Sequence, residues 1–193
     1  MSNIIFFDDN DVRKNLLPLT YTRPTAMLRC GITTIASKWK AAIGDENMTY
    51  SFLTVPYLKP KFPLVARRAN LMIAGHMLPN PELVEQVLSL KSGEALMLGE
   101  ELIAFRGTAR DFDNRHFTSI THPTIVPIAL HYPYDIFEQN GKAMELDFER
   151  LTKGRKSQRI SDSCTVIGDK KNIFIEKGAK VEGAMLNTTE GPI

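Results

Sequence analysis

Near its start the sequence has an uninterrupted apolar run, Ile4–Phe7, that ends directly at Asp8 and Asp9. A run without polar alternation is typical of a strand buried on both faces, as in a parallel sheet covered by helices. Open α/β sheets bind ligands at the carboxyl ends of such strands. The two aspartates are therefore either ligand-binding groups or the start of a solvated turn, and the sequence leaves both interpretations open.

A turn-rich basic segment, Leu16–Lys38, follows this first strand. It carries Arg23 and Arg29 and leads into a predicted helix that ends before Gly44. Strand, basic loop and helix form an arrangement that holds phosphate groups. We therefore expect this segment to contact a phosphorylated ligand.

Strands and helices are predicted to alternate over the first 152 residues, which indicates an α/β sheet domain. Asn80 and Pro81 are a strong signal for the start of one helix, and Gly141 is expected to divide another into 134–139 and 143–151. The second of these pieces is predicted to turn Met144, Phe148 and Leu151 inward. The predicted strands are 4–7, 50–55, 70–74, 95–98, 102–106 and 125–130.

Length and charge exclude several classes of protein. With 193 residues the chain can hold one ordinary domain and a fragment of a second, and a net charge of +2 is too small to indicate a nucleic-acid-binding protein. Cys30 and Cys164 lack metal-ligand spacing, so we expect a reducing compartment. No apolar run reaches membrane-spanning length, and the early aspartates argue against a signal peptide. We expect a cytoplasmic protein that binds neither nucleic acid nor membrane.

The pattern changes after a short basic linker at residues 153–159. In residues 160–193 aliphatic side chains recur at short intervals with small residues between them, and Ile175 and Val181 have hexapeptide spacing. Such repeats place aliphatic residues inside a parallel β-helix. Stacked coils need at least three repeats to bury a core, so we interpret this segment as the first part of a longer β-helix.

Four segments together resemble a known family, the sugar-1-phosphate nucleotidyltransferases. The match is best to a bacterial group in which N-acetylglucosamine-1-phosphate uridylyltransferase is fused to glucosamine-1-phosphate N-acetyltransferase. Members share "LLPLTxTRPxAxLRxG", "LPxPELVE", "LTKGRKS" and "NTTxGPI". These motifs lie within Phe7–Trp39, Gly75–Leu96, Leu151–Ser157 and Asn187–Ile193.

The resemblance implies a Rossmann-like nucleotidyltransferase domain over residues 1–152, the linker 153–159, and the first coils of a left-handed β-helix over residues 160–193. It implies a nucleoside triphosphate and a sugar-1-phosphate as substrates, uridylyl or thymidylyl transfer, and a UDP-N-acetylhexosamine-type product. The remainder of such a protein would be an acetyltransferase, and the full β-helix would form a trimer.

Nucleotidyl transfer needs positive charge on the phosphates and oxygen ligands for Mg²⁺, the cofactor that the family implies. Arginine can bind phosphate through two nitrogens, so Arg23 and Arg29 are the expected catalytic residues. Asp8 or Asp9 is the expected metal ligand. The remaining expected contacts to nucleotide or phosphate are Asp8, Asp9, Arg13, Lys14, Thr22 and His76.

The sequence also departs from the family pattern. Residues 8–15 contain no glycine where a glycine-rich loop normally approaches the triphosphate, and Thr25 stands where the family has a lysine. His76 replaces the aspartate that usually binds magnesium, and imidazole is a poor magnesium ligand. A domain that keeps the fold without catalysis, as a binding or oligomerisation module for the acyltransferase, is therefore the alternative hypothesis.

Overall fold

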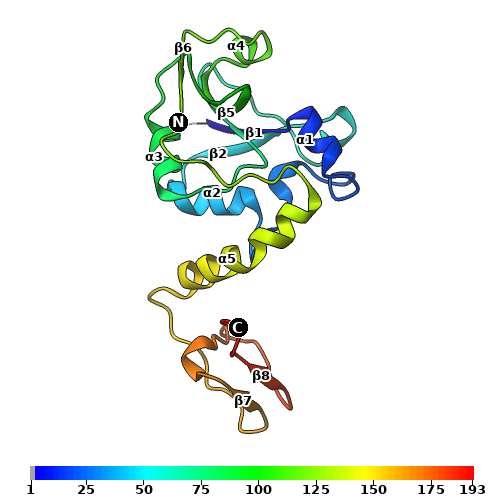
Figure 1. The fold of residues 1–193 in the computed structure, drawn as a ribbon, viewed down its shortest axis with the longest axis vertical. Coiled ribbons are helices and arrows are strands. Elements are labelled where there is room, and N and C mark those ends of the chain that lie inside the picture. Colours follow the sequence, from blue (N-terminus) through cyan, green and yellow to red (C-terminus); the bar gives the residue numbers. More distant parts are fainter. Residues whose placement is uncertain (1–2) are drawn as a thin grey trace.

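The computed structural model describes residues 3–193, and a six-stranded sheet in the order β2-β1-β3-β5-β4-β6 lies at its centre (Figure 1). The first apolar run forms β1 (Asn3–Phe7), and all five of its residues are buried, as predicted. β1 pairs in parallel with β2 (Thr49–Leu53) on one side and with β3 (Asn70–Ala74) on the other. The apolar strands thus form the parallel half of the sheet.

The other half of the sheet is mixed. β5 (Glu101–Gly107) is antiparallel to both β3 and β4 (Glu94–Leu98), which confirms the predicted hairpin, and β6 (Ser119–Thr121) is parallel to β4. The strand predicted at 125–130 is wrong. That segment forms only an isolated bridge between Ala129 and Met77. Pro127 has no N–H to donate to a ladder, and the edge position beside β4 is taken by β6.

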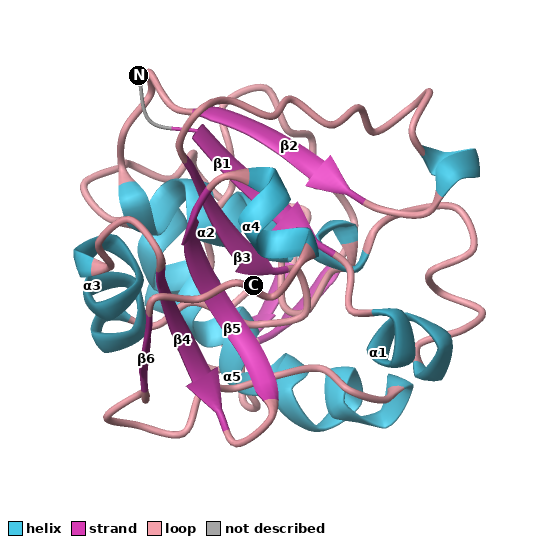
Figure 2. Cartoon of the chain, turned by 90° about the horizontal axis from the view of Figure 1, so that it is seen from above, coloured by secondary structure: helices cyan, strands magenta, loops and turns pink. Residues whose placement is uncertain are grey.

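Helices α2 (Ile35–Ile43) and α3 (Pro81–Ser89) cover one face of the sheet, while α4 (Ala109–Asp113) lies on the opposite side (Figure 1, Figure 2). The expected caps are present: the Asn80 side chain accepts the N–H of Leu83, and Gly44 ends α2 with a φ of 70°. A short helix, α1 (Asn10–Asn15), was not predicted. Asp9 caps it in the stretch where a phosphate loop would lie.

The long helix α5 (Pro133–Thr152) lies against α2 on the side away from the sheet (Figure 1). The predicted break at Gly141 is wrong, because the helix continues through this exposed glycine. Glycine costs a helix only about 1 kcal/mol, and contacts elsewhere along α5 outweigh that cost. The predicted inward face is also wrong at Met144, which is 44% exposed, whereas Ala143 and Asp147 are the buried residues of α5.

Beyond α5 the chain forms a separate small region at the foot of Figure 1. β7 (Thr165–Ile167) and β8 (Met185–Asn187) pair in parallel, so that Thr165 lies opposite Met185, twenty positions later. Ile173 and Ile175 are the buried aliphatic residues between these two strands in the sequence. Among residues 3–193, no helix combines the length and the apolar character that a membrane crossing requires.

Candidate functional site

A cleft of about 500 Å³ opens at the carboxyl ends of β1 and β2. The chain passes from β1 to β2 on one side and later crosses to β3 on the other, so β1 is the point where the strand order reverses. Open α/β sheets bind ligands at that point. The lining comes from the ends of the two strands, from α1 and from α4: Phe7, Asp8, Asp9, Asn10, Asp11, Leu53, Thr54, Val55, Pro56, Phe112 and Arg115.

Asp8 connects three segments at this edge of the sheet. Its Oδ1 accepts the N–H and the hydroxyl of Thr25, at 2.8 and 2.6 Å, and its Oδ2 accepts the Thr54 hydroxyl at 2.5 Å. The Nε of Arg13 lies 3.5 Å from the same Oδ2. The carboxylate is only 4% exposed. Both of its oxygens are therefore used within the protein, which leaves little capacity for a metal ion.

Asp9 has a different environment. Its Oδ1 accepts the N–H groups of Asp11 and Val12, which caps α1. Its Oδ2 has no hydrogen-bond partner among residues 3–193. Because the residue is half-buried and lines the cleft, this oxygen is available to a ligand that enters the cleft. Of the two aspartates considered from the sequence, Asp9 is the better placed to bind a cation.

Arg13 and Lys14 follow in α1 and point to different places. Arg13 is buried, and its Nη2 donates to the carbonyl of Thr20 at 2.6 Å and to the hydroxyl of Tyr57 at 2.8 Å. In this arrangement Arg13 holds the chain together rather than facing a triphosphate. Lys14 is exposed and pairs with Asp11 at 3.1 Å.

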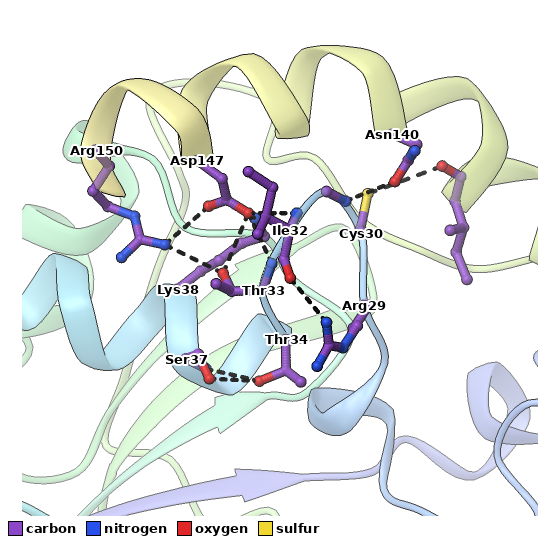
Figure 3. Close-up of polar contacts among 12 residues, drawn as sticks. Arg29, Cys30, Ile32, Thr33, Thr34, Ser37, Lys38, Asn140, Asp147 and Arg150 are labelled. Carbon is purple, nitrogen blue, oxygen red and sulfur yellow. Dashed lines mark hydrogen bonds and ion pairs between the residues drawn. The ribbon is translucent and has the colours of Figure 1, made fainter. Parts of the chain in front are cut away.

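The residues of the basic loop that we expect to contact phosphate are exposed, but they lie in different parts of the loop. Thr22 and Arg23 are exposed, and neither side chain is hydrogen-bonded within residues 3–193. Arg29 is also exposed, and its Nη1 donates to the carbonyl of Ile32 at 3.2 Å (Figure 3). Arg23 thus has a free guanidinium close to the segment that contacts Asp8, whereas Arg29 lies beside the loop that precedes α2.

The loop that precedes α2 already binds an anion, the carboxylate of Asp147 from α5 (Figure 3). Asp147 Oδ2 accepts the N–H groups of Ile32 and Thr33 at 2.9 and 3.0 Å, and it forms a buried ion pair with Lys38. Burial alone would raise the pKa of Asp147, but the hydrogen bonds from Lys38, Thr33 and Arg150 lower it below its usual value. The backbone amides that precede α2 therefore bind a carboxylate of the protein itself.

Gly31 allows α5 to approach this closely. Its φ is +81°, and a Cβ at this position would lie 2.7 Å from the backbone of Ala143. The Gly31 N–H donates to Oδ1 of Asn140 at 2.7 Å. Next to it, Cys30 is fully buried, and burial raises the pKa of its thiol. This part of the loop is a docking surface for α5.

His76 belongs to a cluster that the sequence did not reveal. The residue is fully buried, and its Nε2 lies 2.7 Å from Oε1 of Glu101, while Nε2 of His131 lies 2.8 Å from the same oxygen. Burial would raise the pKa of Glu101, but the two histidine hydrogen bonds lower it below its usual value. Glu101 begins β5 and His131 precedes α5, so only the folded chain brings the three together.

Gly75 links this cluster to the β1 edge. A Cβ on Gly75 would lie 2.4 Å from the Thr25 hydroxyl, so the segment after β3 packs directly on the threonine that Asp8 binds. Thr25 thus fills the space between the ends of β1 and β3. The two halves of the candidate site, Asp8 with Asp9 and His76 with its partners, lie on neighbouring strand ends.

Arg115 is the other residue that sequence reasoning missed. It follows α4 with a φ of 53°, the only positive φ among the non-glycine residues of 3–193, and it lines the cleft as an exposed cation. The acidic residues Asp9 and Asp11 line the same cleft. A positive φ at a bulky residue is the one signal of a special position here, and it is visible only in the structure.

The residues present can be compared with the needs of Mg²⁺, which prefers oxygen ligands in an octahedral arrangement and retains several waters. The carboxylates of Asp9 and Asp11 at the cleft fit that preference. His76 and His131 do not, because imidazole nitrogen suits transition metals. Asp9, with Asp11 beside it, is the residue that would hold magnesium.

The sequence profile of the family described as "Sugar nucleotidyl transferase" matches residues 4–156. The match includes all six strands of the sheet except the first residue of β1, together with α5 and the cleft at the carboxyl end of β1. A search among curated proteins gives no match.

Proposed function

Because the chain belongs to the sugar nucleotidyl transferase family, we propose that it joins a sugar-1-phosphate to a nucleoside triphosphate at the cleft beyond β1. A phosphate oxygen of the sugar-1-phosphate attacks the α-phosphorus, a new P–O bond forms, and pyrophosphate leaves with the electrons of the broken P–O bond. The proposed product is a UDP-N-acetylhexosamine-type nucleotide sugar. The four motifs shared with the uridylyltransferases support that choice of sugar and nucleotide.

One observation carries this proposal: the cleft at the strand-order reversal is lined by a carboxylate oxygen and a guanidinium that have no partner among residues 3–193. Asp9 supplies the carboxylate and Arg115 the guanidinium. A nucleotidyltransferase needs both, because its substrates are polyanions that must be held together with a cation. When bound, Mg²⁺ would neutralise charge on the triphosphate.

The side chains of this chain would do the remaining work by position and charge. Arg23 and Arg115 are free to bind phosphate oxygens, and Arg29, Lys14 and Thr22 are exposed groups that a second phosphate can reach. Asp8 and Arg13 act indirectly, since they hold Thr25 and α1 in place. In this proposal the binding of phosphate depends on side chains, since α1 occupies the place of a glycine-rich backbone loop.

For the rest of the chain we propose a nucleotidyltransferase domain over residues 1–152, a linker at 153–159 and the beginning of a left-handed β-helix at 160–193. The parallel pairing of β7 with β8, twenty residues later, supports the last part, because one coil of a β-helix brings such segments side by side. A complete β-helix would carry the acetyltransferase activity and form a trimer.

A second candidate function is a binding or oligomerisation module without catalysis. Two observations favour it. Asp8 forms hydrogen bonds with Thr25 and an ion pair with Arg13, and the Asp147 carboxylate accepts hydrogen bonds from the backbone amides before α2. Each of these groups would otherwise be available to a substrate. Calorimetry separates the two functions: binding of UTP that depends on magnesium favours the enzyme, and binding of sugar phosphate alone favours the module.

The direct test is pyrophosphate release from UTP and N-acetylglucosamine-1-phosphate in the presence of Mg²⁺. Turnover above buffer is expected, and its absence with every nucleotide and sugar phosphate tried would reject the enzymatic proposal. Arg23→Ala and Arg115→Ala are each expected to lower kcat/KM by at least about tenfold, since hydrogen bonds to charged groups contribute about 1.5–3 kcal/mol.

Arg68→Ala is the matched control for these variants. Arg68 is exposed and precedes β3, so it lies at the opposite end of the strands from the cleft. The Arg68→Ala substitution removes one positive charge from an exposed position, as Arg23→Ala and Arg115→Ala do. Equal losses of activity in Arg68→Ala and Arg115→Ala would show a general charge effect rather than a contact with substrate.

A further inference from the structure

We propose that His76, Glu101 and His131 form a binding site for a divalent transition-metal ion of the zinc type, with a coordination position open to solvent. The three residues offer two imidazole nitrogens and one carboxylate oxygen, and these atoms all lie within 4.8 Å of one another. The inference goes beyond nucleotidyl transfer, because it concerns a second kind of cation at a different strand end.

The main chain, rather than side-chain flexibility, brings the three residues together. Ile73 pairs with Ala104 in the antiparallel β3–β5 ladder, and continuing that register by three residues places His76 opposite Glu101. On the other side of the same segment, the N–H of Leu130 donates to the carbonyl of His76 at 3.0 Å. His131 follows directly. Ligands fixed by three adjoining backbone segments are pre-organised for a metal ion.

The geometry needs only a small adjustment to accept an ion. Both histidines direct Nε2 at Oε1 of Glu101, at 2.7 and 2.8 Å, and their ring centroids are 5.3 Å apart. Around a tetrahedral ion with ligands at about 2.1 Å, ligand atoms are about 3.4 Å apart. The Glu101 oxygen must therefore move back from each nitrogen by less than about 1 Å, and its side chain, 25% exposed, has room to do so. The two Nε2 atoms, which lie within 4.8 Å of each other, must come to a similar separation.

The ion-pair partners of Glu101 are also consistent with a cation site. Among residues 3–193, these partners are the two histidines, and neither lysine nor arginine pairs with the carboxylate. A divalent ion would add positive charge beside this half-buried carboxylate, and Nε2 of each ring would bind it in the deprotonated form.

The donor set selects the kind of metal. Two imidazoles and one carboxylate, with a fourth position left for water or substrate, are typical of zinc sites that remain open. Magnesium prefers oxygen ligands alone and loses its waters reluctantly. The side chain of His131 is 40% exposed, so the fourth position faces solvent at the carboxyl end of the sheet.

The test is a titration of the untagged 193-residue chain, freed of metal by a chelator, with Zn²⁺ and separately with Mg²⁺. One Zn²⁺ per chain is expected with a dissociation constant below about 10 μM, and Mg²⁺ at least a hundredfold weaker. Co²⁺ should give the visible absorption of a four-coordinate ion. The measurements need no nucleotide, so their failure and that of the nucleotidyl transfer proposal remain separate results.

Glu101→Gln and His131→Ala are the decisive variants, because each changes a partly exposed side chain. Each is expected to weaken Zn²⁺ binding by at least about tenfold and to abolish the Co²⁺ absorption. His116→Ala, which removes an exposed histidine elsewhere, is the control. Circular dichroism identifies any variant that fails to fold, and Glu101→Gln, which keeps the side chain's size, is the variant expected to fold. Unchanged Zn²⁺ affinity in folded Glu101→Gln, or no saturable binding by the parent chain, would overturn the proposal.

Discussion

Thr25 donates both its backbone N–H and its hydroxyl to one oxygen of Asp8, at 2.8 and 2.6 Å. The relationship ties the short 3-10 turn Thr25–Met27 of the basic loop to the carboxyl end of β1. It also gives a role to the threonine that stands where the related transferases have a lysine. The loop is held in place by a neutral donor, and the positive charge at Asp8 comes instead from Arg13.

The first prediction concerns this contact. Asp8→Ala removes an acceptor from three hydrogen bonds and leaves Arg13 buried without a carboxylate, so we expect the free energy of unfolding to fall by about 3–5 kcal/mol. Asp9→Ala removes only a helix cap and should cost about 1 kcal/mol. Urea unfolding followed by circular dichroism measures both. Similar losses for the two variants would contradict the assignment of Asp8 as the structural residue.

The second prediction concerns the ion pair between α2 and α5. Asp147→Ala leaves Lys38 buried without a counter-ion and removes the acceptor of the Ile32 and Thr33 amides, so we expect a loss of about 3–5 kcal/mol. Lys38→Met should cost much less, because Asp147 keeps its amide partners and Arg150. Chemical denaturation of both variants provides the comparison. A larger loss for Lys38→Met than for Asp147→Ala would show that the amides are not the main partners.

The third prediction is a dependence of stability on pH. Asp147 has a lower pKa in the folded chain than an aspartate in the unfolded chain, so the unfolded state takes up its proton first as the pH falls. The stabilisation is complete above the unfolded value of about 4 and is lost as the pH falls through the folded pKa. Unfolding free energies should therefore decrease from about pH 5 downward. Asp147→Asn should flatten this slope, and an unchanged slope would contradict the prediction.

The fourth prediction compares Gly31, which packs against α5, with Gly141, an exposed glycine of α5. Gly31→Ala places a Cβ 2.7 Å from the backbone of α5 at a φ of +81°, so we expect a loss of at least about 2 kcal/mol. Gly141→Ala lies in the exposed middle of α5 with open space around it, and it should stabilise the chain by about 0.5–1 kcal/mol. Thermal unfolding should show a lower melting temperature for Gly31→Ala and a higher one for Gly141→Ala. A destabilised Gly141→Ala would show that α5 needs its glycine.

The fifth prediction concerns the two cysteines. Cys30 is fully buried with a raised pKa, whereas Cys164 is partly exposed, and both thiols are free. A thiol reagent should therefore label one cysteine per chain under native conditions and two in denaturant. Cys164→Ser should remove the fast-reacting thiol. Rapid labelling of that variant without denaturant would show that the loop around Cys30 opens readily.

The sequence by itself determined the elements whose signals are local. The apolar runs at β1 and β3 are strands because every side chain in them is apolar or small enough to be buried on both faces. Asn80 begins α3 by the hydrogen bond that its side chain accepts, and Gly44 ends α2 because glycine readily adopts a positive φ. The family motifs are likewise a property of residue order, and they identified the transferase.

Only the tertiary structure decided which charged groups are available to a ligand. Asp8 and Arg13 look like phosphate or metal ligands in the sequence, but partners from other segments of the chain use their polar atoms. The carboxylate of Asp147 accepts hydrogen bonds from the backbone amides before α2, although Asp147 lies more than a hundred residues away in the sequence. Glu101 becomes a neighbour of His76 through the β3–β5 register, and His131 through the hydrogen bond from Leu130 to the His76 carbonyl. The sequence shows which residues are charged. Whether a charged side chain is available to a ligand depends on its burial and its ion-pair partners, and both are set by contacts between segments far apart in the sequence.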